Sequence, residues 1–358
     1  MIQGDKVLKK LERKVQKSNA DALLVNDALT IEYLTNFYSQ GAFLLISKNE
    51  NPFYFVDSMN ASLAKKNLKH TKVSCIVAQG AVINALMLFL SDKKVKTLAF
   101  NDRDVSAREY EMFLQMNPKM KLTKIICNMM VSDFIDEIRE IKTREEIALI
   151  RQAAKKTVQI WKEVKKKIKP GLSEKQIAAM IDLAICRRGY KNSFPTIVAV
   201  GKNTAYPHAV PTEKKFKKNE HVLADFGIIF KGYCSDLTRT LYNGKMNPQI
   251  EVFKKNVLSA QKKAIESIKP GVSLAGVSKK ISLFFKDKKL GNYVLHGLGH
   301  GVGRNVHEAP FWSQNCCKCF KKGMIITIEP GLYKKNLGGV REEDMVLVTD
   351  TGCEVLTK

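Results

Sequence analysis

The sequence predicts an α/β protein in two parts, of which the second contains a duplicated unit. Three observations lead to this prediction. Helical and strand-like segments alternate over the first third of the chain. A long charged helical stretch follows, and two motifs then recur in the same order further along the chain. We expect a boundary at residue 130, which divides the 358 residues into 1–130 and 131–358.

The first part begins with a charged helical segment at residues 6–17. Strands are predicted for the short apolar runs at residues 22–25, 42–47, 52–56, 73–78 and 97–100. Polar residues 48–51 form a turn between two of these runs, and helical segments connect the others. This alternation is typical of an α/β domain.

One continuous helix is predicted for residues 134–167. This stretch is rich in Glu, Lys and Ile, and neither Gly nor Pro interrupts it. Its isoleucines fall roughly on one face, as expected for a helix that packs against a core.

The second part repeats two motifs in the same order. IKPGLS at residues 168–173 returns as IKPGVS at residues 268–273, and FKKNEHVLADFG at residues 216–227 returns as FKKGMIITIEPG at residues 320–331. Each copy predicts a helix, a Pro-Gly turn, a second helix and a β-hairpin. Two such units related by a pseudo-twofold axis would form one domain with a cleft between them.

Four acids occupy matching positions in the two copies. Asp225 and Asp236 lie on the two predicted strands of the first hairpin, and Glu329 and Glu343 do so in the second. A salt bridge to Arg341 would explain one buried acid, but four carboxylates brought together repel each other unless cations lie between them. This oxygen-rich set suits Mn²⁺ or Mg²⁺ better than a thiolate zinc site, and it can bridge two ions.

Half of the six histidines lie in HGLGHGVGRNVHEAP at residues 296–310. They are His296, His300 and His307. The glycine pattern lacks the third glycine of GxGxxG, which disfavours a phosphate-binding loop. Three histidines so close together favour a metal or acid–base site. Their spacing alone leaves open which of them binds a metal.

The net charge of +25 raises the question of a nucleic-acid partner. The basic residues are mostly scattered lysine pairs and triplets, so we expect no specific nucleic acid. No apolar run is long enough to span a membrane, and no apolar signal segment follows the charged N-terminus, which predicts a cytoplasmic protein with no membrane partner. The eight cysteines are therefore expected to be reduced.

Five motifs together resemble the metallopeptidases that include aminopeptidase P, prolidase and methionine aminopeptidase. These motifs are PHAVPT, DFGIIFKGYCSDLTRT, HGLGHGVGRNVHEAP, IEPGLY and GGVREEDMVLVT. Residues 21–46 resemble the creatinase-like N-terminal domain of that family, and residues 138–154 resemble its linker helix. The resemblance implies a creatinase-like α/β domain at residues 1–130. It also implies a pita-bread α/β catalytic domain with pseudo-twofold symmetry at residues 131–358.

The same resemblance implies a site for two divalent metal ions, with Mn²⁺ as first choice and Co²⁺ or Zn²⁺ as alternatives. The implied metal ligands are Asp225, Asp236, His300, Glu329 and Glu343. Glu329 would also handle the proton of the attacking water. The other implied site residues are His208 and His307 at the substrate carbonyl, His296 at the proline pocket and Arg341 beside a ligand carboxylate.

The activity that the resemblance implies is hydrolysis of Xaa-Pro bonds in peptides with proline at the second position, by a homodimer. Several prolidases similar to this chain carry an arginine directly after their HExP motif, where this chain has Phe311. We therefore expect an aminopeptidase P, with prolidase, the Xaa-Pro dipeptidase, as the alternative. A non-catalytic peptide- or nucleic-acid-binding relative is a further alternative, which the five intact ligand positions disfavour.

Overall fold

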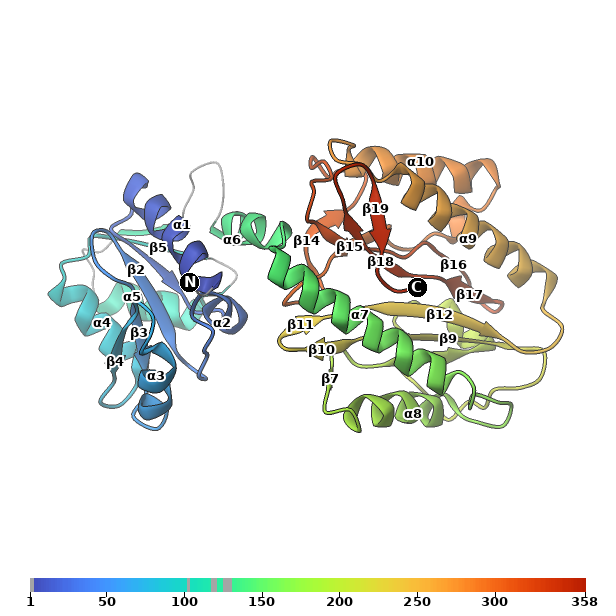
Figure 1. Ribbon diagram of the computed structural model, residues 1–358, viewed down its shortest axis with the longest axis horizontal. Coiled ribbons are helices and arrows are strands. Elements are labelled where there is room, and N and C mark those ends of the chain that lie inside the picture. The colour runs from blue at the N-terminus through green and yellow to red at the C-terminus, as the bar shows by residue number, and fades with distance from the viewer. Residues whose placement is uncertain (1–2, 102–103, 117–120, 125–130) are drawn as a thin grey trace. The chain divides into compact units, whose positions relative to one another are not determined.

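The computed structural model describes residues 3–101, 104–116, 121–124 and 131–358 (Figure 1). The chain divides into two compact units, Met1–Ile138 and Arg139–Lys358. Residue 130, the predicted boundary, lies outside the described residues. The division at residues 1–130 and 131–358 therefore stays a prediction.

The first unit is built on a six-stranded mixed sheet of order β4-β3-β2-β1-β5-β6. Strand β2 runs antiparallel to β1 and β3, whereas β3–β4, β1–β5 and β5–β6 are parallel pairs. The elements are α1 (Gln3–Lys17), β1 (Ala22–Val25), α2 (Ala28–Thr35), β2 (Phe43–Ser47), β3 (Phe53–Val56), α3 (Ala61–Leu68), β4 (Ser74–Val77), α4 (Val82–Asp92), β5 (Thr97–Phe100), α5 (Ala107–Met116) and β6 (Lys121–Lys124).

The central strand β1 is apolar throughout because both faces of this sheet are covered. Leu23 and Val25 belong to one apolar core, which α1, α2 and α3 complete, and Ala22 and Leu24 belong to another, which α4 and α5 complete. This alternation follows from the two-residue period of a strand. The predicted helix and five predicted strands are confirmed. Strand β6 was not predicted, since its sequence KLTK holds a single apolar residue.

The second unit carries helices on both sides of its strands. In Figure 1, α8 lies on one side of them and α9 and α10 lie on the other. The elements up to the middle of the unit are α6 (Val131–Glu140, which begins before the division), α7 (Arg144–Val164), α8 (Glu174–Cys186), β7 (Lys191–Asn192), β8 (Ile197–Val200), η1 (Gly201–Ala205), β9 (His221–Phe226), β10 (Ile228–Phe230), β11 (Tyr233–Cys234) and β12 (Leu237–Tyr242). The remaining elements are α9 (Pro248–Ser267), α10 (Leu274–Asp287), η2 (Gly291–Tyr293), β13 (Gly299–Gly301), β14 (Glu308–Trp312), β15 (Ile325–Ile328), β16 (Gly331–Lys334), β17 (Gly338–Arg341), β18 (Asp344–Val348) and β19 (Cys353–Val355).

The duplicated motifs form equivalent structures in the two halves of this unit. Strands β12-β9-β8 of one sheet correspond to β18-β15-β13 of the other. At the two Pro-Gly turns, the Gly171 N–H donates to the Phe216 carbonyl (2.8 Å) and the Gly271 N–H donates to the Phe320 carbonyl (2.9 Å). The predicted duplication is therefore visible in individual hydrogen bonds.

The prediction of one continuous helix over residues 134–167 is wrong. The helical stretch breaks at residues 141–143, between α6 and α7. Ile141 forms an isolated β-bridge with Met324, and Thr143 caps α7 in a capping box with Glu146. The capping box satisfies N–H groups that a helix start leaves unpaired, so a new helix can begin without a glycine or proline before it.

Each half of the second unit has its own apolar core. One core gathers residues of α7, α8, β8, β9 and β12, and the other gathers residues of α9, α10, β15 and β18. Among the described helices, none is long and apolar enough to cross a lipid bilayer. The described cysteines are free thiols, and Cys127 lies outside the described residues.

Candidate metal centre

The first two acids lie on neighbouring strands of one sheet. Asp225 is near the end of β9, opposite Thr238 of β12, and Asp236 directly precedes β12. The chain between β9 and β12 forms a second hairpin, β10–β11, whose turn residues Lys231 (φ 48°) and Gly232 (φ 80°) are left-handed. This arrangement agrees with the predicted acid-bearing hairpin.

The second pair of acids occupies the matching place in the other half. Glu329 directly follows β15, and Glu343 lies between β17 and β18. His300 is in β13, the neighbour of β15, and its backbone N–H donates to the Thr327 hydroxyl (3.1 Å). The glycine-rich segment is therefore extended, not helical, at His300.

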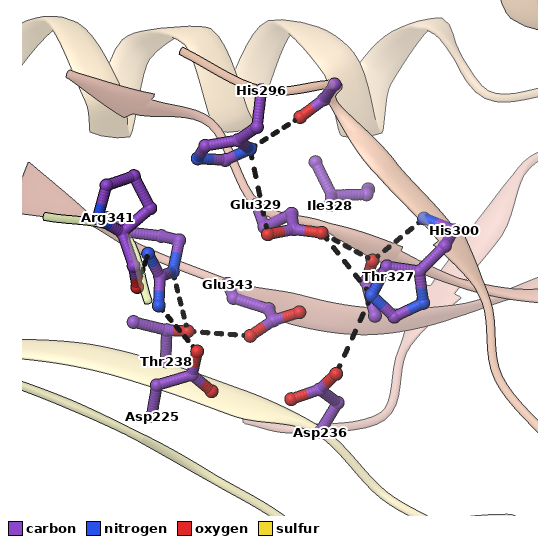
Figure 2. A network of polar contacts seen from close by, with 12 residues as sticks. Asp225, Asp236, Thr238, His296, His300, Thr327, Ile328, Glu329, Arg341 and Glu343 are labelled. Carbon is purple, nitrogen blue, oxygen red and sulfur yellow. Dashed lines mark hydrogen bonds and ion pairs between the residues drawn. The ribbon is translucent and has the colours of Figure 1, made fainter. Parts of the chain in front are cut away.

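The side chains of the two halves converge on one buried point (Figure 2). Asp236, His300 and Glu343 are buried, and each offers a ligand atom within 4.8 Å of the others. His300 Nε2 lies 3.7 Å from Asp236 Oδ2 and 3.4 Å from Glu329 Oε1. Asp225 lines the same cavity as these four residues. The structure thus places at one cavity all five residues that the family resemblance implies as metal ligands.

Arg341 connects the centre to its surroundings. Its Nη2 pairs with Asp225 Oδ2 at 2.5 Å, and its Nε donates to the Thr238 hydroxyl at 3.1 Å (Figure 2). Thr238 in turn donates to Glu343 Oε2 at 2.7 Å. Arg341 Nη1 donates to the Tyr333 hydroxyl at 2.8 Å. Arg341 therefore contacts the predicted ligand Asp225 directly and the predicted ligand Glu343 through Thr238. It orients both carboxylates, as residues that hydrogen-bond to metal ligands do.

The carboxylates strongly perturb each other's protonation. Burial and repulsion from Glu343, Asp225 and Glu329 raise the pKa of Asp236 well above its usual range. Burial and repulsion from Glu329 and Asp225 do the same to the pKa of Glu343. Burial raises the pKa of Glu329 to about 7, although Arg341 opposes the shift. Bound cations would favour the charged forms of all these groups.

A divalent cation fits the donors that this centre offers. Asp225 Oδ1 and Asp236 Oδ1 are buried and have no hydrogen-bond partner among the described residues. Buried polar atoms of this kind call for a partner. Burial and the neighbouring His307 lower the pKa of His300 to about 4, which keeps its imidazole neutral, the form that binds metals. Four carboxylates and one imidazole suit hard or borderline divalent ions.

A cavity of about 630 Å³ opens beside the centre, a size typical of small-ligand sites. His208, His296 and His307 all line it. His307 packs against His300 with ring centroids 4.2 Å apart, and burial lowers the pKa of His307. His296 Nε2 lies 2.7 Å from the Tyr333 hydroxyl, and its Nδ1 lies 3.9 Å from Glu329 Oε2. All the predicted site residues thus face one cavity or contact its wall.

Three hydroxyl groups of this network were not predicted from the sequence, those of Thr238, Thr327 and Tyr333. Thr238 follows Asp236 by two residues in an extended segment, so the period of a strand places both on one face. That spacing could have identified Thr238. Tyr333 reaches the centre through Arg341 and His296, and no spacing in the sequence reveals such contacts.

Comparison with known proteins agrees with this geometry. Residues 148–350 match the model of metallopeptidase family M24, and residues 8–141 match the creatinase/prolidase N-terminal domain. The chain is 31% identical to the Xaa-Pro dipeptidase of Pyrococcus furiosus, over 98% of this chain and 97% of the relative.

Solved structures of this family share the fold over nearly the whole chain. The Xaa-Pro dipeptidase of Bacillus anthracis is 28% identical with a TM-score of 0.91, covering 99% of this chain and 98% of the other. The X-Pro aminopeptidase of Thermotoga maritima is 28% identical with a TM-score of 0.85, covering 98% and 97%. The mixed α/β second unit therefore has the pita-bread fold of these peptidases.

Proposed function

Because the chain belongs to metallopeptidase family M24 and carries a creatinase/prolidase N-terminal domain, we propose that it hydrolyses Xaa-Pro dipeptides. The observation that carries the chemistry is the convergence of four carboxylates and His300 at one cavity, with Asp236, His300 and Glu343 close enough to share an ion. The relative named Xaa-Pro dipeptidase matches nearly the whole chain and supports this substrate. The comparisons thus support the dipeptidase alternative better than the aminopeptidase P that Phe311 favours.

The metal ligands in this proposal are the five converging residues, Asp225, Asp236, His300, Glu329 and Glu343. Two divalent ions held there would supply a water of lowered pKa and polarise the scissile carbonyl. Mn²⁺ is the proposed native ion because the donors are mainly oxygen, with Co²⁺ and Zn²⁺ as alternatives. A homodimer and a cytoplasmic location stay predictions.

Glu329 is the proposed proton carrier. One carboxylate oxygen faces His300 and the other faces His296, so the group lies at the border between the centre and the substrate cavity. There it can accept the proton of the attacking water and return it to the proline nitrogen as the bond breaks.

His208 and His307 are the proposed donors to the substrate carbonyl. Both line the cavity, and a neutral imidazole has one N–H to donate. A donor aimed at an oxygen that becomes negative stabilises the transition state more than the ground state. His296, held by Tyr333, forms the proposed wall of the proline pocket. Arg341 fixes Asp225 and Thr238 and is not itself a proton carrier.

Removal of the first residue from longer peptides is a second candidate activity, which the charge of the cavity favours. In an Xaa-Pro dipeptide, the proline itself carries the free C-terminal carboxylate, which a nearby cation would bind. Among the described residues that line the cavity, Arg341 is the one lysine or arginine, and its guanidinium is already paired with Asp225. Phe311, 55% exposed, lines the cavity at the position directly after HEAP, where several similar prolidases carry an arginine.

The two activities are separated by their products. Purified protein with Mn²⁺ is incubated with Ala-Pro, Ala-Pro-Ala and Ala-Pro amide, and the products are resolved by chromatography. A dipeptidase releases proline from Ala-Pro and leaves Ala-Pro-Ala intact. Cleavage of Ala-Pro-Ala and the amide but not of Ala-Pro would instead establish the aminopeptidase. Cleavage of none of them by folded, metal-loaded protein would refute both.

A further inference from the structure

The two halves of the second unit differ sharply at one buried position. Helices α8 and α10 both follow a Pro-Gly turn, and the side chains of Ser173 and Ser273 each accept from the backbone N–H three residues on, with Gln176 completing a capping box in α8. The residue directly after the serine is Glu174 in the first half and Leu274 in the second, and both are 0% exposed. A leucine there needs only an apolar core, whereas a buried carboxylate needs hydrogen-bond donors to offset its lost hydration.

Glu174 finds four donors, and all come from one segment of chain. Its Oε1 accepts from the Val200 N–H (2.7 Å) and from Asn203 Nδ2 (2.9 Å). Its Oε2 accepts from the Thr212 N–H (2.9 Å) and from the Thr212 hydroxyl. The two oxygens of one carboxylate therefore hold the two ends of the segment at residues 200–212.

The segment between these anchors carries His208. Its middle is poorly packed, since Tyr206 is 59% and Val210 is 80% exposed. Arg341 Nη1 touches the Pro207 carbonyl at 3.3 Å. A loop with few apolar contacts depends on such polar anchors for a defined conformation.

We propose that Glu174 is a positioning residue, which holds His208 at the substrate cavity by fixing both ends of the 200–212 segment. This role rests on the proposed function of His208 at the scissile carbonyl. Glu174 itself touches neither substrate nor metal in the proposal. In the second half, where Leu274 takes the place of Glu174, the corresponding segment after β13 carries His307, and it is held by Glu308, which pairs with Arg139 and Lys142.

The test compares two changes at Glu174 with a matched change elsewhere. Glu174→Gln keeps one acceptor oxygen, and Glu174→Leu copies the second half and removes both. Glu146→Gln is the control, because Glu146 is also buried in the first turn of a helix but accepts from Thr143 and Tyr233 instead. Hydrogen exchange of the 200–212 amides, metal content, kcat and KM are measured for each variant.

We expect Glu174→Leu to lower kcat by about 10²-fold, as a misplaced catalytic group does, with Glu174→Gln intermediate. Metal content stays at the wild-type level, because the ligands lie on other segments, and amide exchange rises within residues 200–212 alone. In a His208→Ala background, Glu174→Leu changes kcat by no more than about twofold, because residues that act through one group are not additive.

Three outcomes overturn the proposal: wild-type kcat in Glu174→Leu, fully additive losses with His208→Ala, or unchanged exchange in the segment. Loss of metal together with activity in Glu174→Leu would also overturn it, since that indicates general unfolding of the centre. If the wild-type protein cleaves no Xaa-Pro substrate, the proposed function fails by itself. The exchange measurement then still decides whether Glu174 holds the segment.

Discussion

At the scale of single residues, Arg341 shows how one side chain organises the centre. It contacts Asp225, Thr238, Tyr333 and the Pro207 carbonyl at once. Burial alone would lower its pKa, but the neighbouring Tyr333 and Asp225 raise it well above the usual range, so the guanidinium remains charged. Its planar fork makes several contacts that a lysine ammonium cannot make together.

We predict that Arg341→Lys weakens metal binding by about 10–100-fold, the usual effect of losing a residue that hydrogen-bonds to the metal ligands. Titration calorimetry of the metal-free protein with Mn²⁺ measures this change. Arg188→Lys is the control, because Arg188 pairs with Glu163 outside the centre. An unchanged dissociation constant in Arg341→Lys would show that the arginine does not support the ligand carboxylates.

Phe311 permits a direct test of substrate length. Phe311→Arg places a cation at the exposed edge of the cavity, where it can bind the carboxylate of a dipeptide. One charge-assisted hydrogen bond corresponds to roughly tenfold in binding, so kcat/KM for Ala-Pro should rise about tenfold relative to Ala-Pro-Ala. Phe311→Met, which adds no charge, should leave this ratio unchanged. If Phe311→Arg and Phe311→Met had the same ratio of kcat/KM for Ala-Pro to that for Ala-Pro-Ala, residue 311 would be excluded as a determinant of substrate length.

His221 predicts a dependence of stability on pH that is separate from the metal centre. It is buried between the Thr204 hydroxyl and the Gly339 carbonyl, and burial lowers its pKa from 6.5 to about 4. The unfolded chain therefore binds a proton between these values that the folded chain does not. Stability from this group is complete above pH 6.5 and is lost as pH falls towards 4.

At pH 5 we expect this one histidine to remove about 2 kcal/mol of the unfolding free energy measured at pH 7.5. Urea unfolding of the wild type and of His221→Gln at both pH values gives the difference. The glutamine variant should lack this part of the pH dependence, because its side chain does not titrate. The same pH dependence in both proteins would contradict the assignment to His221.

At the scale of elements, the Pro-Gly turns connect sequence to structure most clearly. Gly171 (φ +98°) and Gly271 (φ +85°) both adopt left-handed backbone conformations, and a Cβ on either would meet no atom within 4 Å. The cost of Gly→Ala at these sites is thus backbone strain alone, about 1 kcal/mol.

We predict that Gly171→Ala and Gly271→Ala destabilise the protein by similar amounts and leave kcat unchanged. Gly276→Ala is the control, because Gly276 lies within α10 at a helical φ, where alanine is favoured over glycine. Thermal unfolding of the three variants measures the effect. A large difference between the two turn variants would contradict their structural equivalence.

The sequence was informative wherever a local pattern determines a structure. The duplicated motifs predicted two equivalent halves, and apolar runs predicted five strands of the first sheet correctly. The break before α7 contains neither Gly nor Pro, so these residues do not reveal it, although Thr143 and Glu146 form a readable capping pattern. The partners of Glu174 could not be predicted, since its donors lie up to 38 residues away and come partly from backbone N–H groups.

At the scale of the whole molecule, the chain carries a net charge of +25, whereas the centre itself gathers four carboxylates. The lysine clusters at residues 165–167 and 286–289 are exposed and lie outside the cavity lining. The absence of a specific nucleic-acid partner stays a prediction from the scattered arrangement of lysines along the sequence. The buried carboxylates, by contrast, come from segments far apart in the chain, so only the complete fold of the second unit can assemble them.

The most direct test of this account is the release of alanine from Ala-Pro and Ala-Pro-Ala as Mn²⁺ is added to metal-free protein. The account predicts no release without metal and a rise that ends at two ions per chain. It also predicts no activity for Asp236→Asn, whose amide cannot replace a buried ligand carboxylate. Failure of folded wild-type protein to release alanine from either peptide at any Mn²⁺ or Co²⁺ concentration would contradict the central claim. So would full activity of Asp236→Asn.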